Sequence, residues 1–437
     1  MRLIRILKYD LCREVAAWVG EEIITTNQAE SICSRYGVDF NNMSRRSYGY
    51  RVLVGFGCLF IGLALISLIG ANWDEIPRAI RMSGLIALTL GAHLLGLVYF
   101  RQDQTNRAIA FFFLGSLFYG ASIMLIAQIY HIGEHYPDGI FWWAIGVLPV
   151  GILMESTMIM MLAVCLGFIW FFVESSMNFY PALFPVFLIA LFWHLRRGRQ
   201  SNISFLVLVA GLGTWAEYTL AWLMSDEAGF RPGAENVVFA VGLFAIFHGL
   251  SKWLEKSQHT VIGDYGTLLG LWTLRFTIIT MFVFSFEEPW RELIEAQWHI
   301  PGIAITISFL CTAAAIWLSY RSRKSIISTV AFALMLNIGL IAVLLSDNRE
   351  NALVFQFADN ILLVSIGIGL IIQGIQNHIS HYFYAGVFSI LATGLLRYID
   401  LIGNYVGASI LFAILAAVLL LVAKYWKNHQ AKTRGAS

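Results

Sequence analysis

The sequence predicts an all-α fold: a polytopic bundle of transmembrane helices preceded by a short N-terminal helical hairpin. Hydrophobic residues make up 58% of the 437 positions and charged residues only 13%, whereas a soluble domain has about 25% charged residues. About fourteen segments are apolar over nearly the full length of roughly 20 residues that a helix needs to cross a bilayer. Basic residues alternate between the connecting segments, which is typical of a multi-pass membrane protein.

The first 50 residues form the one sizeable polar segment, and they predict two helices, at residues 3–19 and 27–36. Thr26 or Asn27 can cap the start of the second helix, with Glu30 as the carboxylate of a capping box. We expect this hairpin to lie in the cytoplasm, where it could recruit a protein partner.

Residues 51–425 predict the transmembrane bundle, and residues 426–437 a cytoplasmic tail. The fourth and fifth spans are short and are separated by only three residues, so a re-entrant pair and a total of twelve spans stay open as an alternative. The expected spans are 52–71, 80–100, 108–130, 140–154, 157–173, 179–195, 203–224, 236–254, 265–286, 300–320, 326–345, 358–375, 382–400 and 405–424.

The distribution of basic residues predicts that both termini are cytoplasmic. Most of the 29 Lys and Arg residues lie in the N-terminal segment, the tail and every second loop. Such residues accumulate on the cytoplasmic side of membranes. The loops assigned to the outer side hold only Arg78, Arg81, Arg231, Arg291 and Arg349. The net charge of +2 leaves no general basic surface for nucleic acid.

One outer segment predicts an additional, interfacial helix. The stretch EEPWRELIEAQWHIPG, residues 287–302, is rich in acidic residues and holds Trp290 and Trp298. Tryptophan is enriched at the level of the lipid headgroups, so these two residues are the expected anchors.

Two other outer loops, NWDEIPR and HIGEHYPDG, hold most of the polar residues that suggest a site. We expect these loops to meet in one aromatic and ionisable mouth, whose carboxylates would attract cations and whose histidines would make any activity sensitive to mildly acidic pH. A purely structural interpretation stays open, because Asn72 or Asp74 can cap the following helix. The candidate residues are Asn72, Trp73, Asp74, Glu75, Gln128, Tyr130, His131, Glu134, His135 and Asp138.

The segment HIGEH also matches the H-x-x-E-H pattern of a class of zinc peptidases, which makes His131, Glu134 and His135 weak candidate metal ligands. A zinc site of that kind needs a helix through the motif and a third ligand. Gly133 interrupts the motif and Pro137 follows it. We therefore expect a solvated loop, with no metal or cofactor.

Four ionisable residues inside the expected spans are further candidates, because a charge in the bilayer core is costly and needs a partner. Arg275 lies near the middle of its span and should face the bundle interior. Glu217 is its first candidate partner, and Glu155 and Glu174 are weaker ones. Arg397 and Asp400 are three residues apart and can pair on one helix face. Structural pairing and a solute pathway both explain such residues.

Three stretches together resemble one family: IGANWDEIPRAIR, YGASIMLIAQIYHIGEHYPDGIFWWAIG and QAESICSRYG. They are similar to bacterial membrane proteins catalogued as domain of unknown function 2157, over roughly residues 5–150, and LLRYIDL is similar to a closing segment of such proteins. The resemblance implies a multi-pass protein of the bacterial inner membrane and carries over no catalytic residue. By analogy the residues to examine are Asn72, Trp73, Asp74, Gln128, Tyr130, His131, Pro137, Asp138, Trp142 and Trp143.

Three functions stay open on the sequence. Many spans, short loops and a few interior charges favour a transporter or permease for a small or lipid-linked solute. The polar N-terminal segment favours a non-catalytic envelope or assembly protein that recruits a partner. A membrane-embedded, metal-dependent hydrolase would use HIGEH. We expect the first, with the lipid bilayer as the surrounding partner and with no catalytic residue.

Overall fold

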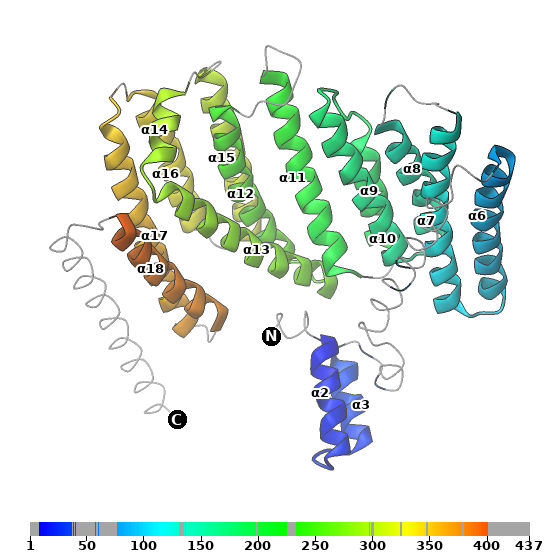
Figure 1. Ribbon diagram of the computed structural model, residues 1–437. Helices are drawn as coiled ribbons and strands as arrows, with labels where there is room; N and C mark the ends of the chain where they lie inside the picture. Colours follow the sequence, from blue (N-terminus) through cyan, green and yellow to red (C-terminus); the bar gives the residue numbers. More distant parts are fainter. Residues whose placement is uncertain are drawn as a thin grey trace. The chain divides into compact units, whose positions relative to one another are not determined.

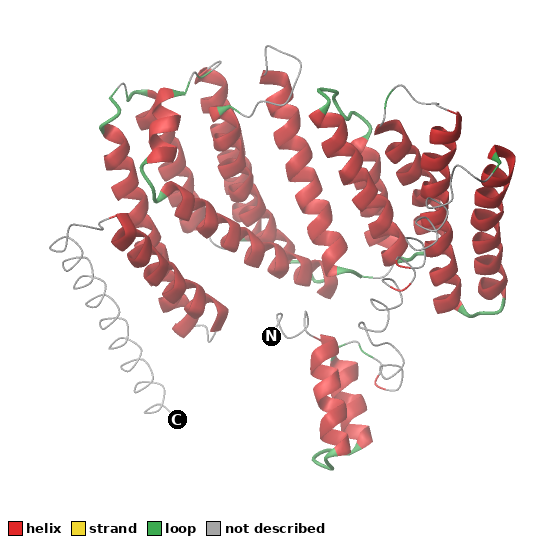
Figure 2. Cartoon of the chain, viewed as in Figure 1, coloured by secondary structure: helices red, strands yellow, loops and turns green. Residues whose placement is uncertain are grey.

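The computed structural model describes nine stretches of the chain. These are residues 8–36, 77–130, 137–197, 200–224, 233–296, 301–323, 326–346, 348–376 and 380–400, with the single positions 38, 40, 57, 60, 135 and 298. Within them the regular secondary structure is α-helical and there is no strand (Figure 2). The predicted all-α fold class is confirmed.

The chain divides into two compact units, each of which is described by itself. The first unit comprises Met1–Pro232 and Trp253–Leu268, and the second comprises Gly233–Lys252 and Leu269–Ser437. The helices of the first unit are α2 (Lys8–Gly20), α3 (Thr26–Arg35), α6 (Arg78–Arg101), α7 (Thr105–Tyr130), α8 (Pro137–Leu153), α9 (Thr157–Ser176), α10 (Phe184–Arg197) and α11 (Asn202–Met224) (Figure 1). Most of the second unit is built from α12 (Ala234–Glu255), α13 (Thr260–Phe284), α14 (Glu288–Glu295), α15 (Pro301–Ser322), α16 (Ile326–Leu344), α17 (Asn351–Gln376) and α18 (Ser380–Asp400).

Every predicted span that falls within the described residues corresponds to one helix. Among the described residues, eight helices are long and apolar enough to cross a membrane, namely α6, α7, α9, α11, α12, α13, α15 and α17. Helix α8 and part of α16 are shorter apolar helices. The predicted spans 52–71 and 405–424 lie outside the described residues, so the total of fourteen stays a prediction.

The predicted short pair of spans forms two separate helices, α8 and α9. They are joined by a tight turn in which Glu155 has a left-handed backbone with φ of 46°. Helix α9 has 20 residues, long enough to span, because it extends three residues beyond the predicted end. Helix α8 has 17 residues with Pro149 inside it, so its crossing stays a prediction.

The capping box of α3 lies earlier than predicted. Thr25 is the N-cap, its backbone N–H donates to Gln28 Oε1 over 2.9 Å, and the backbone N–H of Gln28 donates to Thr25 Oγ1 over 3.4 Å. Two otherwise unpaired donors are thus satisfied reciprocally. The predicted caps Thr26 and Asn27, with Glu30 as the carboxylate, were therefore wrong.

Three other helix starts differ from the prediction by five residues or more. Helix α13 begins at Thr260, five residues early. Helix α10 begins at Phe184, five residues late, because Asn178 has φ of 62° and a proline follows in the connecting segment. Helix α17 begins at Asn351, seven residues early. Its first turns pack on α14, where the ring of Trp290 stacks on Phe355 with centroids 5.3 Å apart.

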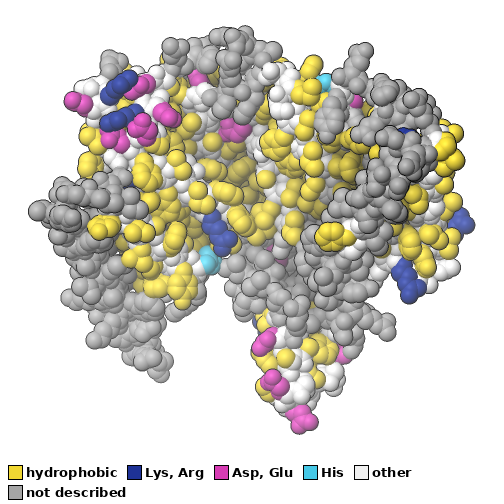
Figure 3. Space-filling model, viewed as in Figure 1, with side chains coloured by type: hydrophobic (Ala, Val, Ile, Leu, Met, Phe, Trp, Pro, Cys, Tyr) yellow, Lys and Arg dark blue, Asp and Glu magenta, His cyan; other side chains and the backbone are white. Residues whose placement is uncertain are grey.

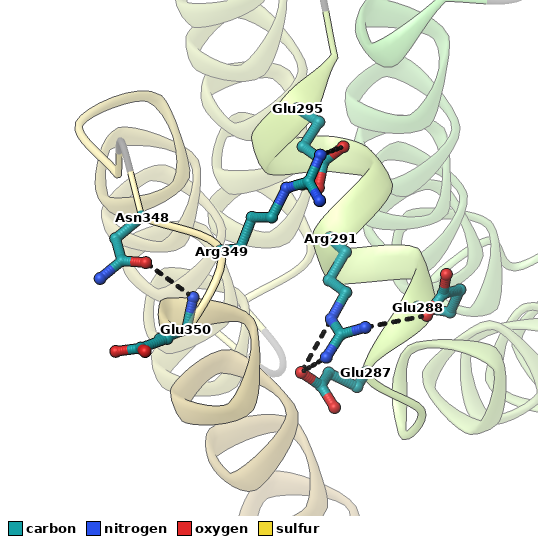
Figure 4. Close-up of polar contacts among 7 residues, drawn as sticks. All are labelled: Glu287, Glu288, Arg291, Glu295, Asn348, Arg349 and Glu350. Carbon is teal, nitrogen blue, oxygen red and sulfur yellow. Dashed lines mark hydrogen bonds and ion pairs between the residues drawn. The ribbon is translucent and has the colours of Figure 1, made fainter.

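The predicted interfacial segment does form a helix, α14, and one ion pair connects it to the turn that precedes α17 (Figure 4). Arg349 Nε lies 2.6 Å from Glu295 Oε1, and Arg291 Nη2 lies 2.7 Å from Glu287 Oε1 within α14. Such exposed pairs contribute at most about 1 kcal/mol each. Of these, only the Arg349–Glu295 pair links α14 to a neighbouring segment.

The helices expose much of their apolar surface. The centre of the first unit is packed from Val164, Phe171, Phe184, Phe187 and Leu191, which are almost inaccessible. Many other large side chains, including Leu94, Phe309 and Ile338, are exposed, and hydrophobic side chains cover much of the described surface in Figure 3. A soluble monomer rarely exposes such patches. These faces fit contact with lipid.

Candidate functional site

Most of the predicted outer mouth lies outside the described residues. This applies to Asn72, Trp73, Asp74, Glu75, His131 and Glu134, and the side chains of Gln128 and Tyr130 at the end of α7 are not described either. The predicted meeting of the two loops therefore stays a prediction. The zinc interpretation of HIGEH stays untested, although the described residues hold no group of three metal-ligating side chains.

In the described part of the mouth, His135 contacts Glu174, a residue that the sequence analysis paired with Arg275. His135 Nε2 lies 2.9 Å from Glu174 Oε2 near the end of α9, and the edge of the imidazole packs on Phe179 with ring centroids 4.6 Å apart. Glu174 was considered a partner of Arg275, not of a histidine. Asp138 lies in the first turn of α8, where a negative charge is favourable for the helix dipole.

The predicted burial of Arg275 is wrong. Its side chain is exposed on α13, and its guanidinium carbon lies 5.1 Å from the centroid of the Trp272 ring. A cation over an aromatic face is stabilised, and a long Arg side chain can carry its charge toward the membrane surface. Glu217 is half-buried on α11 and belongs to the other unit, so the pairing of the two stays a prediction.

A buried polar cluster in the second unit forms the best-defined candidate site. We define the Asp359 cluster as Ser285, Gln356, Asp359, Asn360 and Arg397. Gln356 Nε2 and Asn360 Nδ2 donate to the carbonyl oxygen of Ser285 over 3.1 and 3.3 Å. Ser285 directly follows the end of α13, whose last carbonyls lack partners within the helix. The two amides of α17 therefore cap α13.

Arg397 on α18 reaches the same end of α13. Its Nη2 lies 3.4 Å from Ser285 Oγ, to which it donates, and its guanidinium carbon lies 5.3 Å from the centroid of the Phe286 ring. A cation at a helix C-terminus is favoured by the helix dipole. The side chain of Asp400 is not described, so the predicted pairing of Arg397 with Asp400 remains a prediction.

Capping accounts for every member of the cluster except Asp359. Its side chain is only 8% exposed, and no donor among the described residues reaches its Oδ2 atom. The neighbouring Asn360 Oδ1 is likewise buried without a donor. The positive charge of Arg397 acts on the carboxylate across the α17–α18 interface. A buried acceptor without a donor is uncommon and needs an explanation.

Asp359 is the candidate that the sequence analysis missed. The predicted span begins at residue 358, so Asp359 falls at its edge, and the residue is not among the predicted intramembrane charges. The available signal was the run QFADN, in which three polar residues interrupt an otherwise apolar helix. The structure buries that face because α17 starts seven residues earlier than predicted.

The motif residues Trp142 and Trp143 belong to a close contact of α8 with α7. Trp143 Nε1 donates to the carbonyl oxygen of Ser116 over 2.9 Å. Its indole lies against Gly120, four residues further along α7, where a Cβ atom would overlap the ring. Glycine at this position therefore leaves the Ser116 carbonyl accessible to the second helix.

The same arrangement recurs in the opposite direction. Tyr119 OH on α7 donates to the carbonyl oxygen of Trp142 on α8 over 3.4 Å. The Tyr119 ring lies against Gly146, again four residues after the accepting carbonyl. Each helix thus places an aromatic ring on a glycine of the other. We call these two contacts the aromatic–glycine clasp. The motif residues Trp142 and Trp143 are thus explained by packing between α7 and α8.

The long apolar helices and their short connections define a polytopic α-helical membrane protein. Residues 16–160 match the family described as predicted membrane protein (DUF2157). The resemblance found in the sequence is confirmed over that segment, which contains α3 and the aromatic–glycine clasp. The Asp359 cluster lies beyond it. No curated protein and no solved structure matches the chain.

Proposed function

We propose that the protein is a transporter of the bacterial inner membrane for a small polar solute, with Asp359 on the path of the solute or of a coupled proton. The observation that supports this is the buried Oδ2 atom of Asp359, which has no donor in the described structure. Ionisable residues within transmembrane segments are rare, and they often mark solute or proton pathways.

The chemistry of Asp359 and its neighbour Arg397 supports binding of a hydrogen-bond donor at Asp359. An ionised carboxylate only accepts hydrogen bonds, whereas a protonated one also donates. A proton, an ammonium group or a hydroxyl group would supply what Asp359 Oδ2 lacks. Binding there would compete with the attraction of Arg397 and so weaken a tie between α17 and α18. Alternating access requires helices whose contact can form and break, and the attraction between α17 and α18 would then be such a contact.

An alternative function has one observation in its favour. Helices α2 and α3 pack around a small core of their own, in which Cys12, Val15, Ala29 and Cys33 are fully buried. A hairpin with its own core could present a surface to a cytoplasmic protein. This favours an assembly or recruiting role, which a pull-down with and without residues 1–50 would test.

Flux measurements test the transport proposal. The purified protein is reconstituted into liposomes that contain a pH-sensitive dye, and proton uptake is driven by a potassium diffusion potential, with and without amino acids, sugars and nucleosides outside. We expect uptake above that of empty liposomes and a loss of about tenfold in Asp359→Asn.

Ser365→Ala is the matched control, because Ser365 is an exposed polar residue on the same helix, bonded only to its own backbone. It should transport like the wild type. Uptake equal to that of empty liposomes under all solute conditions, or an unchanged rate in a folded Asp359→Asn variant, would rule the proposal out.

A further inference from the structure

The first unit contains an apolar groove with a volume of about 620 Å³ between α6, α7 and α8. It lies at the aromatic–glycine clasp, well away in sequence from the Asp359 cluster. The residues that line it include Ile86, Leu90, Tyr119, Ile123, Ile126 and Trp142.

Most of the few polar atoms in the groove are already satisfied. Thr89 Oγ1 donates to a carbonyl one turn back over 2.9 Å and lies 3.1 Å from Ser122 Oγ. Ser122 Oγ donates to the carbonyl one turn back in its own helix over 2.7 Å, and Tyr119 OH is used by the clasp. Among the described side chains that line the groove, only the indole N–H of the half-exposed Trp142 has no assigned partner, so the occupant should be mainly hydrocarbon.

The depth of the groove matches one leaflet of a bilayer. Trp142 is five residues from the start of α8, about 8 Å along the axis, and Thr89 is eleven residues from the start of α6, about 17 Å. The hydrocarbon core is about 30 Å thick. The groove therefore runs from near the headgroups to about the middle of the membrane.

The walls of the groove are open sideways. Leu90 and Trp142 are each 57% exposed, and both α6 and α7 are long and apolar enough to span. A chain could enter from the bilayer without crossing a polar barrier. We infer that the groove is a binding site for one acyl chain of a phospholipid from the leaflet that adjoins the start of α6. This inference is independent of the proposed transport function.

Photocrosslinking tests the site in the full-length protein. Proteoliposomes are made with phosphatidylethanolamine that carries a diazirine in one acyl chain, and labelled peptides are quantified by mass spectrometry. We expect the peptide with Trp142 to be labelled several-fold more than the lipid-facing peptide of α16 around Ile338. Ala127→Trp, which fills the groove, should reduce the Trp142 label about fivefold and leave the α16 label unchanged.

Leu97→Trp is the matched control, because Leu97 is exposed on α6 but does not line the groove; it should keep the label. Leu90→Trp at the rim is a second filling variant if Ala127→Trp fails to fold. Equal labelling of the two peptides, or a Trp142 label that survives both filling variants, would overturn the inference. So would absence of the label, since another part of the chain, such as predicted span 52–71, would then cover the groove.

Discussion

The residue that most needs an explanation is Asp359, a carboxylate that is nearly inaccessible and has no donor at Oδ2 among the described residues. Gln356 and Asn360 cap α13, and Arg397 donates to the Ser285 hydroxyl at the end of that helix. If Asp359 served only to balance the charge of Arg397, a direct ion pair would be the expected geometry. No such pair with Asp359 is formed among the described residues, which is why we propose a donor from outside the chain.

The electrostatic coupling of Asp359 and Arg397 can be measured by a double-mutant cycle. Arg397→Met should destabilise the folded protein by about 3 kcal/mol, because removal of one partner leaves a buried charge uncompensated. Arg397→Met with Asp359→Leu should recover most of that loss. Unfolding in mixed detergent micelles, followed by circular dichroism, measures Arg397→Met, Asp359→Leu and the double variant. Additive effects of the two single changes would show that the charges do not interact.

Arg275 shows where residue-scale reasoning from sequence went wrong. The rule that a charge in a span must be buried ignores the length of the side chain and the presence of an aromatic neighbour. Trp272 is three residues before Arg275, so its ring is on the same helix face and can carry the guanidinium. The sequence contained that signal, but the pairing with Glu217 was preferred.

At the scale of elements, the aromatic–glycine clasp predicts that adding even a methyl group at Gly120 on α7 destabilises the protein. Gly120→Ala should destabilise by about 1–3 kcal/mol, the usual cost of overpacking, because a methyl group there overlaps the Trp143 ring. Gly91→Ala on α6 is the control, since a Cβ atom at Gly91 meets nothing within 4 Å. Melting temperature in detergent compares the two; an equal effect would mean that the clasp does not hold α7 and α8 together.

The start of α3 gives a second test at this scale. Thr25→Ala removes the observed cap and should cost about 1 kcal/mol, whereas Thr26→Ala, at the position predicted from sequence, should cost little. Hydrogen exchange of the amides of residues 27–29 measures the difference, with about fivefold faster exchange expected for Thr25→Ala alone. Faster exchange in Thr26→Ala instead would restore the original capping prediction.

For the whole molecule, the sequence located the helices well because span length and composition are set by the bilayer and read directly from the chain. It failed at ends and contacts. The starts of α10 and α17 depend on a left-handed residue and on packing against α14, and the His135–Glu174 pair joins residues 39 positions apart. Hydropathy alone does not predict these helix starts or this contact between distant residues. The Asp359 cluster was missed for the same reason, since it is assembled from three helices of the second unit.

Contacts within each unit fit the alternation predicted from the basic residues. His135 and Glu174 were both assigned to the outer side and are in contact, and so were Arg349 and Glu295. Contacts between loops of one side are required of any correct topology, although they do not say which side is cytoplasmic.

The orientation is the remaining whole-molecule prediction. Both termini should be cytoplasmic, because most Lys and Arg residues outside the spans lie in the terminal segments and in the loops of the same side. Alkaline phosphatase, which is active only outside the cytoplasm, should be active when fused after Pro137 and inactive when fused after Arg199. A fluorescent reporter that matures only in the cytoplasm should give the reverse pattern and serves as the control for expression. If phosphatase is active after Arg199 and silent after Pro137, the whole topology is inverted, and the lipid chain proposed for the groove would come from the cytoplasmic leaflet.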